Sequence, residues 1–116
     1  MKKINILKNS RDFDRIIKKY KPYKYKDYII YLEKETNNVY KFGLSVGKKI
    51  GNAVRRNKVN RQIKSIIYQK DYKNNFNCII IVGKGINERT FEERKENLLI
   101  ALNNLNLMKE KVHEKK

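Results

Sequence analysis

The sequence predicts an α+β fold, a sandwich of helices against one sheet in the order helix-strand-strand-strand-helix-strand-helix. Helical periodicity and strand-like runs alternate along the chain, and a basic stretch with helical spacing lies between two strands. The 116 residues suffice for one domain, and with 40% of them hydrophobic the chain can build one packed core. We therefore expect a single domain over residues 1–116, with a loosely ordered amino terminus (1–9) and a charged tail (109–116).

The first helix is predicted over about residues 11–20. Ser10 is the expected N-cap, and acidic residues in the first turn suit the positive end of the helix dipole. An apolar face recurs at helical spacing and comprises Phe13, Ile16, Ile17 and Tyr20. Pro22 is expected to stop this helix.

Residues 23–34 are rich in aromatic and β-branched side chains and predict strand, with a short separate strand at 23–26. One face is expected to carry Tyr23, Tyr25, Ile29 and Tyr31, and the other Tyr28, Ile30 and Leu32. The turn residues 36–38 predict that residues 39–46 pair with this strand as a hairpin. Tyrosines interleaved with lysines suit nucleic-acid stacking, although tyrosine also suits any half-buried strand.

The most distinctive stretch is KKIGNAVRRNKVNRQIK, residues 48–64, which contains no acidic residue. Asn52 is the expected N-cap of a helix over about 53–70, and Gly51 permits a tight turn before it. Steps of 100° place four residues on a buried stripe: Val59, Ile63, Ile66 and Ile67. The opposite side carries Asn57, Lys58, Arg61, Lys64 and Tyr68, with Arg55 and Arg56 flanking the stripe in the first turn.

The last two elements have clear boundaries. Residues 78–82 form a continuous apolar run typical of a central strand that is covered on both faces, and Gly83 and Gly85 bound the turn after it. Thr90 and Glu93 have the spacing of a capping box, which predicts a helix to about residue 108. Its inward side chains are expected to be Leu98, Ile100, Ala101, Leu102 and Leu105.

The charge indicates a polyanionic partner. Lys and Arg total 29 against 12 acids, which gives a net charge of +17. Repulsion among so many like charges destabilises a small domain. A helix start offers N–H groups to anions, and arginine offers forked donors to phosphate, so nucleic acid is favoured. An anionic membrane surface is an alternative, but there is neither a transmembrane-length apolar run nor a secretory signal.

The sequence gives little sign of an enzyme active site made of protein side chains. Cys78 and His113 are the only residues of their types, which leaves no internal disulfide, suits the cytoplasm, and excludes a His-based metal site. Glu92, Glu93 and Glu96 are close on one helix, but the helix dipole explains the first two without a metal nuclease. A helix-turn-helix DNA-binding motif would need another helix shortly before the basic helix, and the sequence predicts none at that spacing. A general RNA-binding or ribosome-associated module and a merely solvated basic face remain alternatives.

Residues 42–64, FGLSVGKKIGNAVRRNKVNRQIK, closely resemble the signature of the protein subunit of bacterial ribonuclease P, and weaker agreement extends over most of the chain. The resemblance implies a left-handed β-α-β crossover, similar to a ribosomal-protein domain. It implies that the catalyst is the RNA subunit, which binds magnesium, and that the protein carries no catalytic residue, metal or cofactor. The partners would be ribonuclease P RNA and the 5′ leader of precursor tRNA, in the cytoplasm.

The RNA-binding residues expected in the basic helix and its entry are Lys48, Lys49, Arg55, Arg56, Asn57, Lys58, Arg61 and Lys64, of which all but Arg55 are carried over from the resemblance by position. The leader-cleft residues that the resemblance implies are Phe13, Ile17 and Tyr31. Lys58 and Lys64 stand where the family usually has Arg, so they keep charge without the bidentate fork. Asn60 replaces a usual Lys or Arg, and Ile17 replaces a frequent aromatic. Phe13 suits either a core role or a cleft role.

Overall fold

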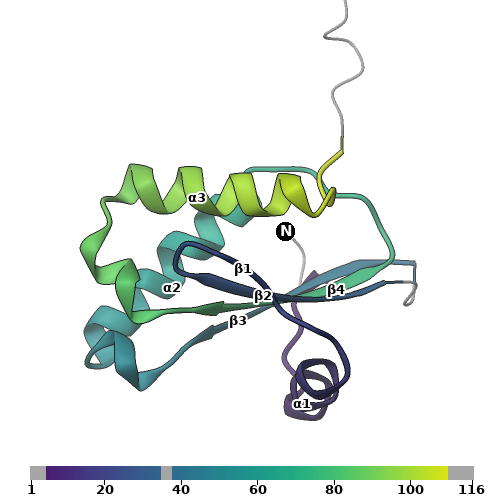
Figure 1. The fold of residues 1–116 in the computed structure, drawn as a ribbon, viewed down its shortest axis with the longest axis horizontal. Helices are drawn as coiled ribbons and strands as arrows, with labels where there is room; N and C mark the ends of the chain where they lie inside the picture. Colours follow the sequence, from purple (N-terminus) through teal and green to yellow (C-terminus); the bar gives the residue numbers. More distant parts are fainter. Residues whose placement is uncertain (1–4, 35–37, 110–116) are drawn as a thin grey trace, which may run out of the picture.

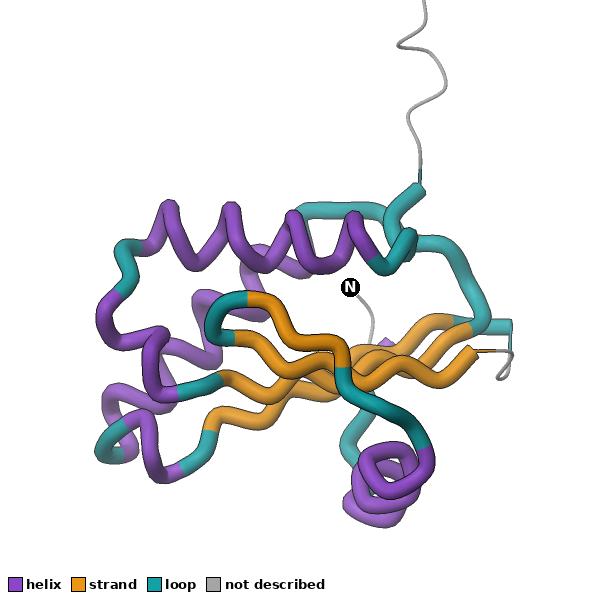
Figure 2. Tube along the Cα trace, in the orientation of Figure 1, coloured by secondary structure: helices purple, strands orange, loops and turns teal. Residues whose placement is uncertain are grey.

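The computed structural model describes residues 5–34 and 38–109, which form a four-stranded mixed sheet with helices on both faces (Figure 1). The sheet has the order β1-β2-β4-β3. Its strands are β1 (Tyr23–Tyr25), β2 (Tyr28–Lys34), β3 (Tyr40–Val46) and β4 (Phe76–Val82). Helix α1 (Ser10–Lys19) covers one face, and α2 (Ala53–Tyr68) and α3 (Phe91–Asn104) cover the other (Figure 2). The predicted α+β sandwich is confirmed.

The predicted hairpin between β2 and residues 39–46 is wrong. Strand β4 lies between them, antiparallel to β2 and parallel to β3. Its side chains are apolar in both directions, Cys78 and Ile80 toward one cluster and Ile79 and Ile81 toward the other, so β4 is stable only at the centre. The chain β3-α2-β4 therefore makes the parallel β-α-β crossover that the resemblance implies. Of the predicted turn, residues 36 and 37 lie outside the described residues.

A tight turn joins β1 to β2 and changes the predicted faces. Tyr25 pairs with Tyr28 across the ladder, and Tyr23 pairs with Ile30. Directly paired residues point to the same face of a sheet. Tyr23 and Tyr25 therefore share the core face of Tyr28 and Ile30, whereas an unbroken strand would have placed them opposite. Lys26, in the turn, has a φ of 53°, which continuous strand does not allow.

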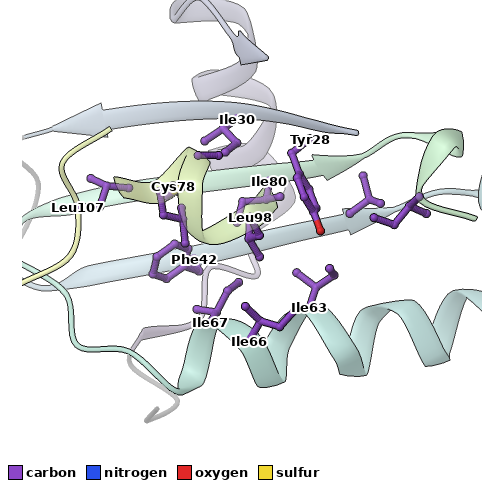
Figure 3. Close-up of a cluster of buried hydrophobic side chains, with 14 of the residues drawn as sticks. Tyr28, Ile30, Phe42, Ile63, Ile66, Ile67, Cys78, Ile80, Leu98 and Leu107 are labelled. Atoms are coloured by element: carbon purple, nitrogen blue, oxygen red, sulfur yellow. The ribbon is translucent and has the colours of Figure 1, made fainter. Parts of the chain in front are cut away.

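The main core lies between the sheet and the pair α2 and α3 (Figure 3). The predicted α2 stripe is fully confirmed: Val59, Ile63, Ile66 and Ile67 are buried. The Thr90 capping box is confirmed as well, because Glu93 N donates to Thr90 Oγ1 at 3.1 Å and Thr90 N donates to Glu93 Oε1 at 2.9 Å. Both helices are shorter than predicted, and Ile100 is only half-buried.

Helix α1 packs on the other face over a smaller cluster. Its N-cap is Asn9 rather than Ser10, because Asn9 Oδ1 accepts from Arg11 N at 2.8 Å. Arg15 donates from Nη1 and Nη2 to the two carboxylate oxygens of Glu33 on β2, and Asn77 Nδ2 donates to the same carboxylate at 2.9 Å. The Arg15 hydrogen bond lowers the pKa of Glu33 despite its burial. This network fastens α1 across β2 and β4.

The segment before α1 lies along the free side of β3. Leu7 N donates to Phe42 O at 2.9 Å, and Asn5 Nδ2 donates to Tyr40 O at 2.7 Å. Ile6 forms a parallel bridge with Phe42. Residues 5–7 therefore act as a short extra strand that brings the start of α1 close to α2. Residues 1–4 and 110–116 lie outside the described part of the chain.

Candidate nucleic-acid interface

The start of α2 is a tight turn built by a glycine and an asparagine. Gly51 has a φ of 149°, and a Cβ at this position would lie 2.7 Å from Arg55 Cδ. Asn52 Oδ1 accepts from Arg55 N at 3.0 Å, so the predicted N-cap is confirmed. The turn lets Arg55 fold back over it, where Nη1 contacts Asn87 Oδ1 at 3.4 Å. No residue of this first turn is acidic, so the positive end of the helix dipole is not compensated within the turn.

The outward side of α2 is a row of exposed polar and basic side chains, as predicted: Asn57, Lys58, Arg61 and Lys64. Lys48 and Lys49, in the short turn η2 (Lys48–Ile50), are exposed next to the start of the helix. Within the described residues, the ion pairs join Arg15 and Arg89 to acids, and none involves a cation of this row. The row therefore keeps an uncompensated positive field that attracts polyanions.

Two polar atoms on the inner flank of α2 have no partner. Arg56 Nε and Asn60 Oδ1 are both buried without a hydrogen bond. The two residues are one turn apart and thus neighbours on the helix surface. A buried donor or acceptor without a partner costs about 1–3 kcal/mol, which a bound ligand can recover.

A cleft of about 270 Å³ opens beside this flank, at the edge of β3. Phe42 and Leu44 of β3 form its apolar floor, and Ile67 of α2 lies beside them. The α2 wall continues through Asn60, Lys64 and Tyr68, and the opposite wall is the segment before α1. Tyr68 is 40% exposed, which is unusual for a large aromatic side chain and leaves part of its ring open to a ligand.

Phe13 belongs both to the smaller cluster and to the cleft. Its ring lies against β3 at Gly43, where a Cβ would come within 2.5 Å of Phe13 Cζ. Glycine at this position therefore allows the ring to reach the strand. Ile17 and Tyr31 pack in the smaller cluster and do not line the cleft. Of the predicted leader-cleft residues, the structure thus brings only Phe13 next to Lys64.

The described residues contain no group of three or more His, Cys, Asp or Glu side chains that could hold a metal ion. The single cysteine, Cys78, is fully buried, which raises its pKa and keeps the thiol protonated. In the described part of the chain, no helix is long and apolar enough to cross a membrane.

The family model of ribonuclease P matches residues 1–106. The chain belongs to the ribonuclease P protein family. The ribonuclease P protein component of Bacillus pumilus is 38% identical over 84% of this chain and 85% of its own length. The ribonuclease P protein component of Streptococcus agalactiae is 35% identical over 88% of this chain and 94% of its own length. The chain is accordingly an accessory subunit of ribonuclease P, an endoribonuclease of tRNA processing.

Solved ribonuclease P proteins share the fold. The Staphylococcus aureus protein superposes with a TM-score of 0.80 at 25% identity, over 90% of this chain and 98% of its own. The Thermotoga maritima protein gives a TM-score of 0.75 at 26% identity, over 84% of this chain and 94% of its own. The fold of this chain is thus shared with ribonuclease P proteins from two other bacteria.

Sequence reasoning misses three parts of this ribonuclease P surface. For Asn60 it predicts only the loss of a basic contact, whereas the structure makes this residue an unpaired wall residue of the cleft. It places Tyr68 with the solvent-facing row, and Tyr68 also lines the cleft. For Phe42 and Leu44 it predicts only a strand. No local signal marks these residues, because the cleft depends on where the segment before α1 meets β3.

Proposed function

We propose that this subunit binds ribonuclease P RNA through the start and outward row of α2, and holds the 5′ leader of precursor tRNA in the β3 cleft. The observation that carries the proposal is the juxtaposition of uncompensated cations with an apolar cleft on one helix. In this proposal the RNA subunit is the catalyst and binds magnesium, and the complex acts in the bacterial cytoplasm, where precursor tRNA is processed.

The two surfaces suit two kinds of RNA contact. The surface here presents the point charges of Lys48 and Lys49 and the forked donors of the arginines in the first turn of α2, which suit the phosphates of a folded RNA. The cleft combines Lys64 with the rings of Phe13 and Tyr68, which suits a single strand whose bases are free to stack. A leader is single-stranded, whereas the rest of a tRNA is largely paired. This difference supports assigning the leader to the cleft.

The decisive experiment is reconstitution with ribonuclease P RNA at low magnesium, using precursor tRNA with and without a leader. We expect the protein to enhance cleavage and to favour the leader-bearing substrate. A general RNA-binding module predicts equal affinity for both substrates, and this outcome would contradict the proposal. Cleavage by the protein without RNA would overturn the assignment of catalysis to the RNA subunit.

The cleft assignment is tested by Lys64→Gln against the matched charge variant Lys24→Gln. Lys24 is exposed on β1, at the other edge of the sheet. Affinity for a single-stranded leader should fall with salt at a log–log slope near −0.7 per phosphate contact. Lys64→Gln should make this slope shallower by roughly 0.7, because one phosphate contact is lost. Equal slopes for the two variants would remove Lys64 from the leader contact.

A further inference from the structure

The turn that leads into α2 is held by a residue far away in the sequence. Asn87 lies in the short turn η3 (Lys84–Glu88), which follows β4. Its Nδ2 donates to Ile50 O, the last carbonyl group of η2, at 2.9 Å. Its Oδ1 accepts from Arg55 Nη1 at 3.4 Å, which is a longer and therefore weaker hydrogen bond. One amide thus joins the end of η2 to the first turn of α2.

Turn η3 is itself fastened to the body of the protein. Both of its ends are held by the turn between β1 and β2, because Gly83 N and Arg89 Nε each donate to Asp27 at 2.7 Å, to the carbonyl oxygen and to Oδ2 respectively. Ile86, inside η3, is fully buried, and its carbonyl group accepts from Arg94 Nε at 3.1 Å. Turn η3 therefore acts as a brace between the β1–β2 turn and the entry of α2.

The backbone at this entry depends on such outside support. Turn η2 is a single 3₁₀ turn, in which Gly51 N donates to Lys48 O at 3.2 Å. The hydrogen-bond geometry of a 3₁₀ turn is poor, so one turn holds its shape weakly by itself. Gly51 adds conformational freedom, because glycine is restricted less than any other residue. Without the bond to Ile50 O, the RNA would have to order Lys48 and Lys49 as it binds, at a cost in affinity.

We propose that Asn87 is a positioning residue for RNA binding: by holding Ile50 O, it fixes η2 and the start of α2 in the arrangement that meets the phosphates of ribonuclease P RNA. The inference rests on the RNA-binding surface proposed above and adds to it a residue that acts without touching RNA. Loss of the amide should raise the cost of ordering the surface and leave the number of phosphate contacts unchanged. A salt titration separates the two quantities, because its slope reports the number of contacts.

The test measures binding of the full chain to ribonuclease P RNA over a range of salt concentrations. Asn87→Ala should weaken binding by about 2- to 12-fold, the range of one neutral hydrogen bond, with an unchanged log–log slope. In the free protein, hydrogen exchange at the Ile50 and Gly51 amides should become faster, while exchange at Ile63, in the middle of α2, should stay the same. Asn103→Ala, an exposed site at the far end of α3, should leave all of these values unchanged.

Asn87→Asp keeps nearly the same shape and separates the two hydrogen bonds of the amide. The aspartate loses the donor to Ile50 O but keeps an acceptor, now charged, beside Arg55. Binding should fall at least as far as in Asn87→Ala. The slope should become shallower by roughly 0.7 to 0.9, because the carboxylate neutralises one cation of the surface.

The outcomes distinguish this inference from the proposed function. Unchanged RNA affinity in both Asn87 variants overturns the inference alone, provided that Lys48→Gln still weakens binding. Weaker binding of Asn87→Ala without faster exchange at Ile50 would make Asn87 a direct RNA contact, and faster exchange at Ile63 as well would make its role a general one in stability; either result overturns the inference. If Lys48→Gln binds ribonuclease P RNA as tightly as the wild type, the proposed RNA-binding surface is wrong too.

Discussion

The two faces of the sheet differ in how completely they are closed. The face toward α2 and α3 carries a continuous core from Tyr28 to Leu107, in which even buried polar groups are joined (Figure 3). Tyr28 donates its hydroxyl to Arg94 O at 2.9 Å, and Arg94 Nη1 donates to Gln62 Oε1 at 2.6 Å. On the face toward α1, the buried hydrophobic side chains among the described residues are Leu7, Ile16 and Ile79, and the aromatic side chains are half-covered.

The cleft lies where the two sides meet, because Phe42, Leu44 and Ile67 belong to the main core whereas Leu7 and Phe13 belong to the smaller cluster under α1. Helix α2 stands at the boundary, because its stripe faces the closed core while its flank and outer row face the cleft and solvent. Substitutions on the closed side should change stability most, and those at the boundary should change RNA binding with little effect on stability.

The largest expected effect is the loss of a core side chain. Ile63→Ala should lower the free energy of unfolding by about 2–5 kcal/mol, since Ile63 is fully buried in the large cluster. Ile17→Ala on the α1 face should cost about 1 kcal/mol, because Ile17 is only half-buried. Urea unfolding of both variants measures the difference. Equal losses would contradict the contrast between the two faces.

At the boundary, Arg56→Ala should weaken binding to ribonuclease P RNA by roughly 10- to 150-fold, as expected for a lost charged hydrogen bond of about 1.5–3 kcal/mol. Its stability should stay the same or rise slightly, because Arg56 Nε is buried without a partner in the free protein. A filter-binding titration and a thermal melt measure the two quantities. A large drop in melting temperature with unchanged RNA affinity would make Arg56 a structural residue.

The α1 face should respond to acid through Glu33. The Arg15 hydrogen bond lowers the folded-state pKa of this carboxyl below its unfolded value of about 4.3. The stabilisation is therefore fully present above the unfolded pKa and is lost as pH falls through the folded pKa. Wild type should lose more stability than Glu33→Gln between about pH 5 and pH 3, in denaturant titrations. Parallel pH profiles would show that the pair does not fasten α1.

The smallest effect is expected at Gly43. The added methyl of Gly43→Ala would displace the Phe13 ring, which can swing outward because Phe13 is half-buried. We expect about 1 kcal/mol of lost stability, the low end for an added methyl group, with a few-fold weaker leader binding from one disturbed stacking contact. Gly47→Ala is the matched control, because a methyl group added there would have no neighbour within 4 Å among the described residues. Leader binding that is equal in the two variants would separate Phe13 from the cleft.

Features set by local spacing could be predicted from the sequence. The Asn52 cap, the Thr90 capping box and the apolar stripe of α2 each depend on residues within a few turns of one another, and each is confirmed. The central strand was recognisable for the same reason, since residues 78–82 are apolar in both directions.

Features set by distant contacts could not be predicted in this way. Nearness in sequence favoured pairing β2 with β3, but β4 enters between them from a distance of many residues. One tight turn at Lys26 was enough to reverse the predicted faces of Tyr23 and Tyr25. The cleft depends on residues 5–7 reaching β3, so nothing in the neighbourhood of Asn60 in the sequence marks it as a wall residue.

The segment before α1 also has a consequence for how copies of this subunit behave toward one another. An uncovered strand at the border of a sheet offers unpaired N–H and C=O groups to another chain, which is a route to aggregation. Residues 5–7 cap this border at β3, and at the opposite border β1 is short and carries Lys24. Removal of residues 1–7 should therefore promote self-association of the protein as it folds, before its RNA partner is bound.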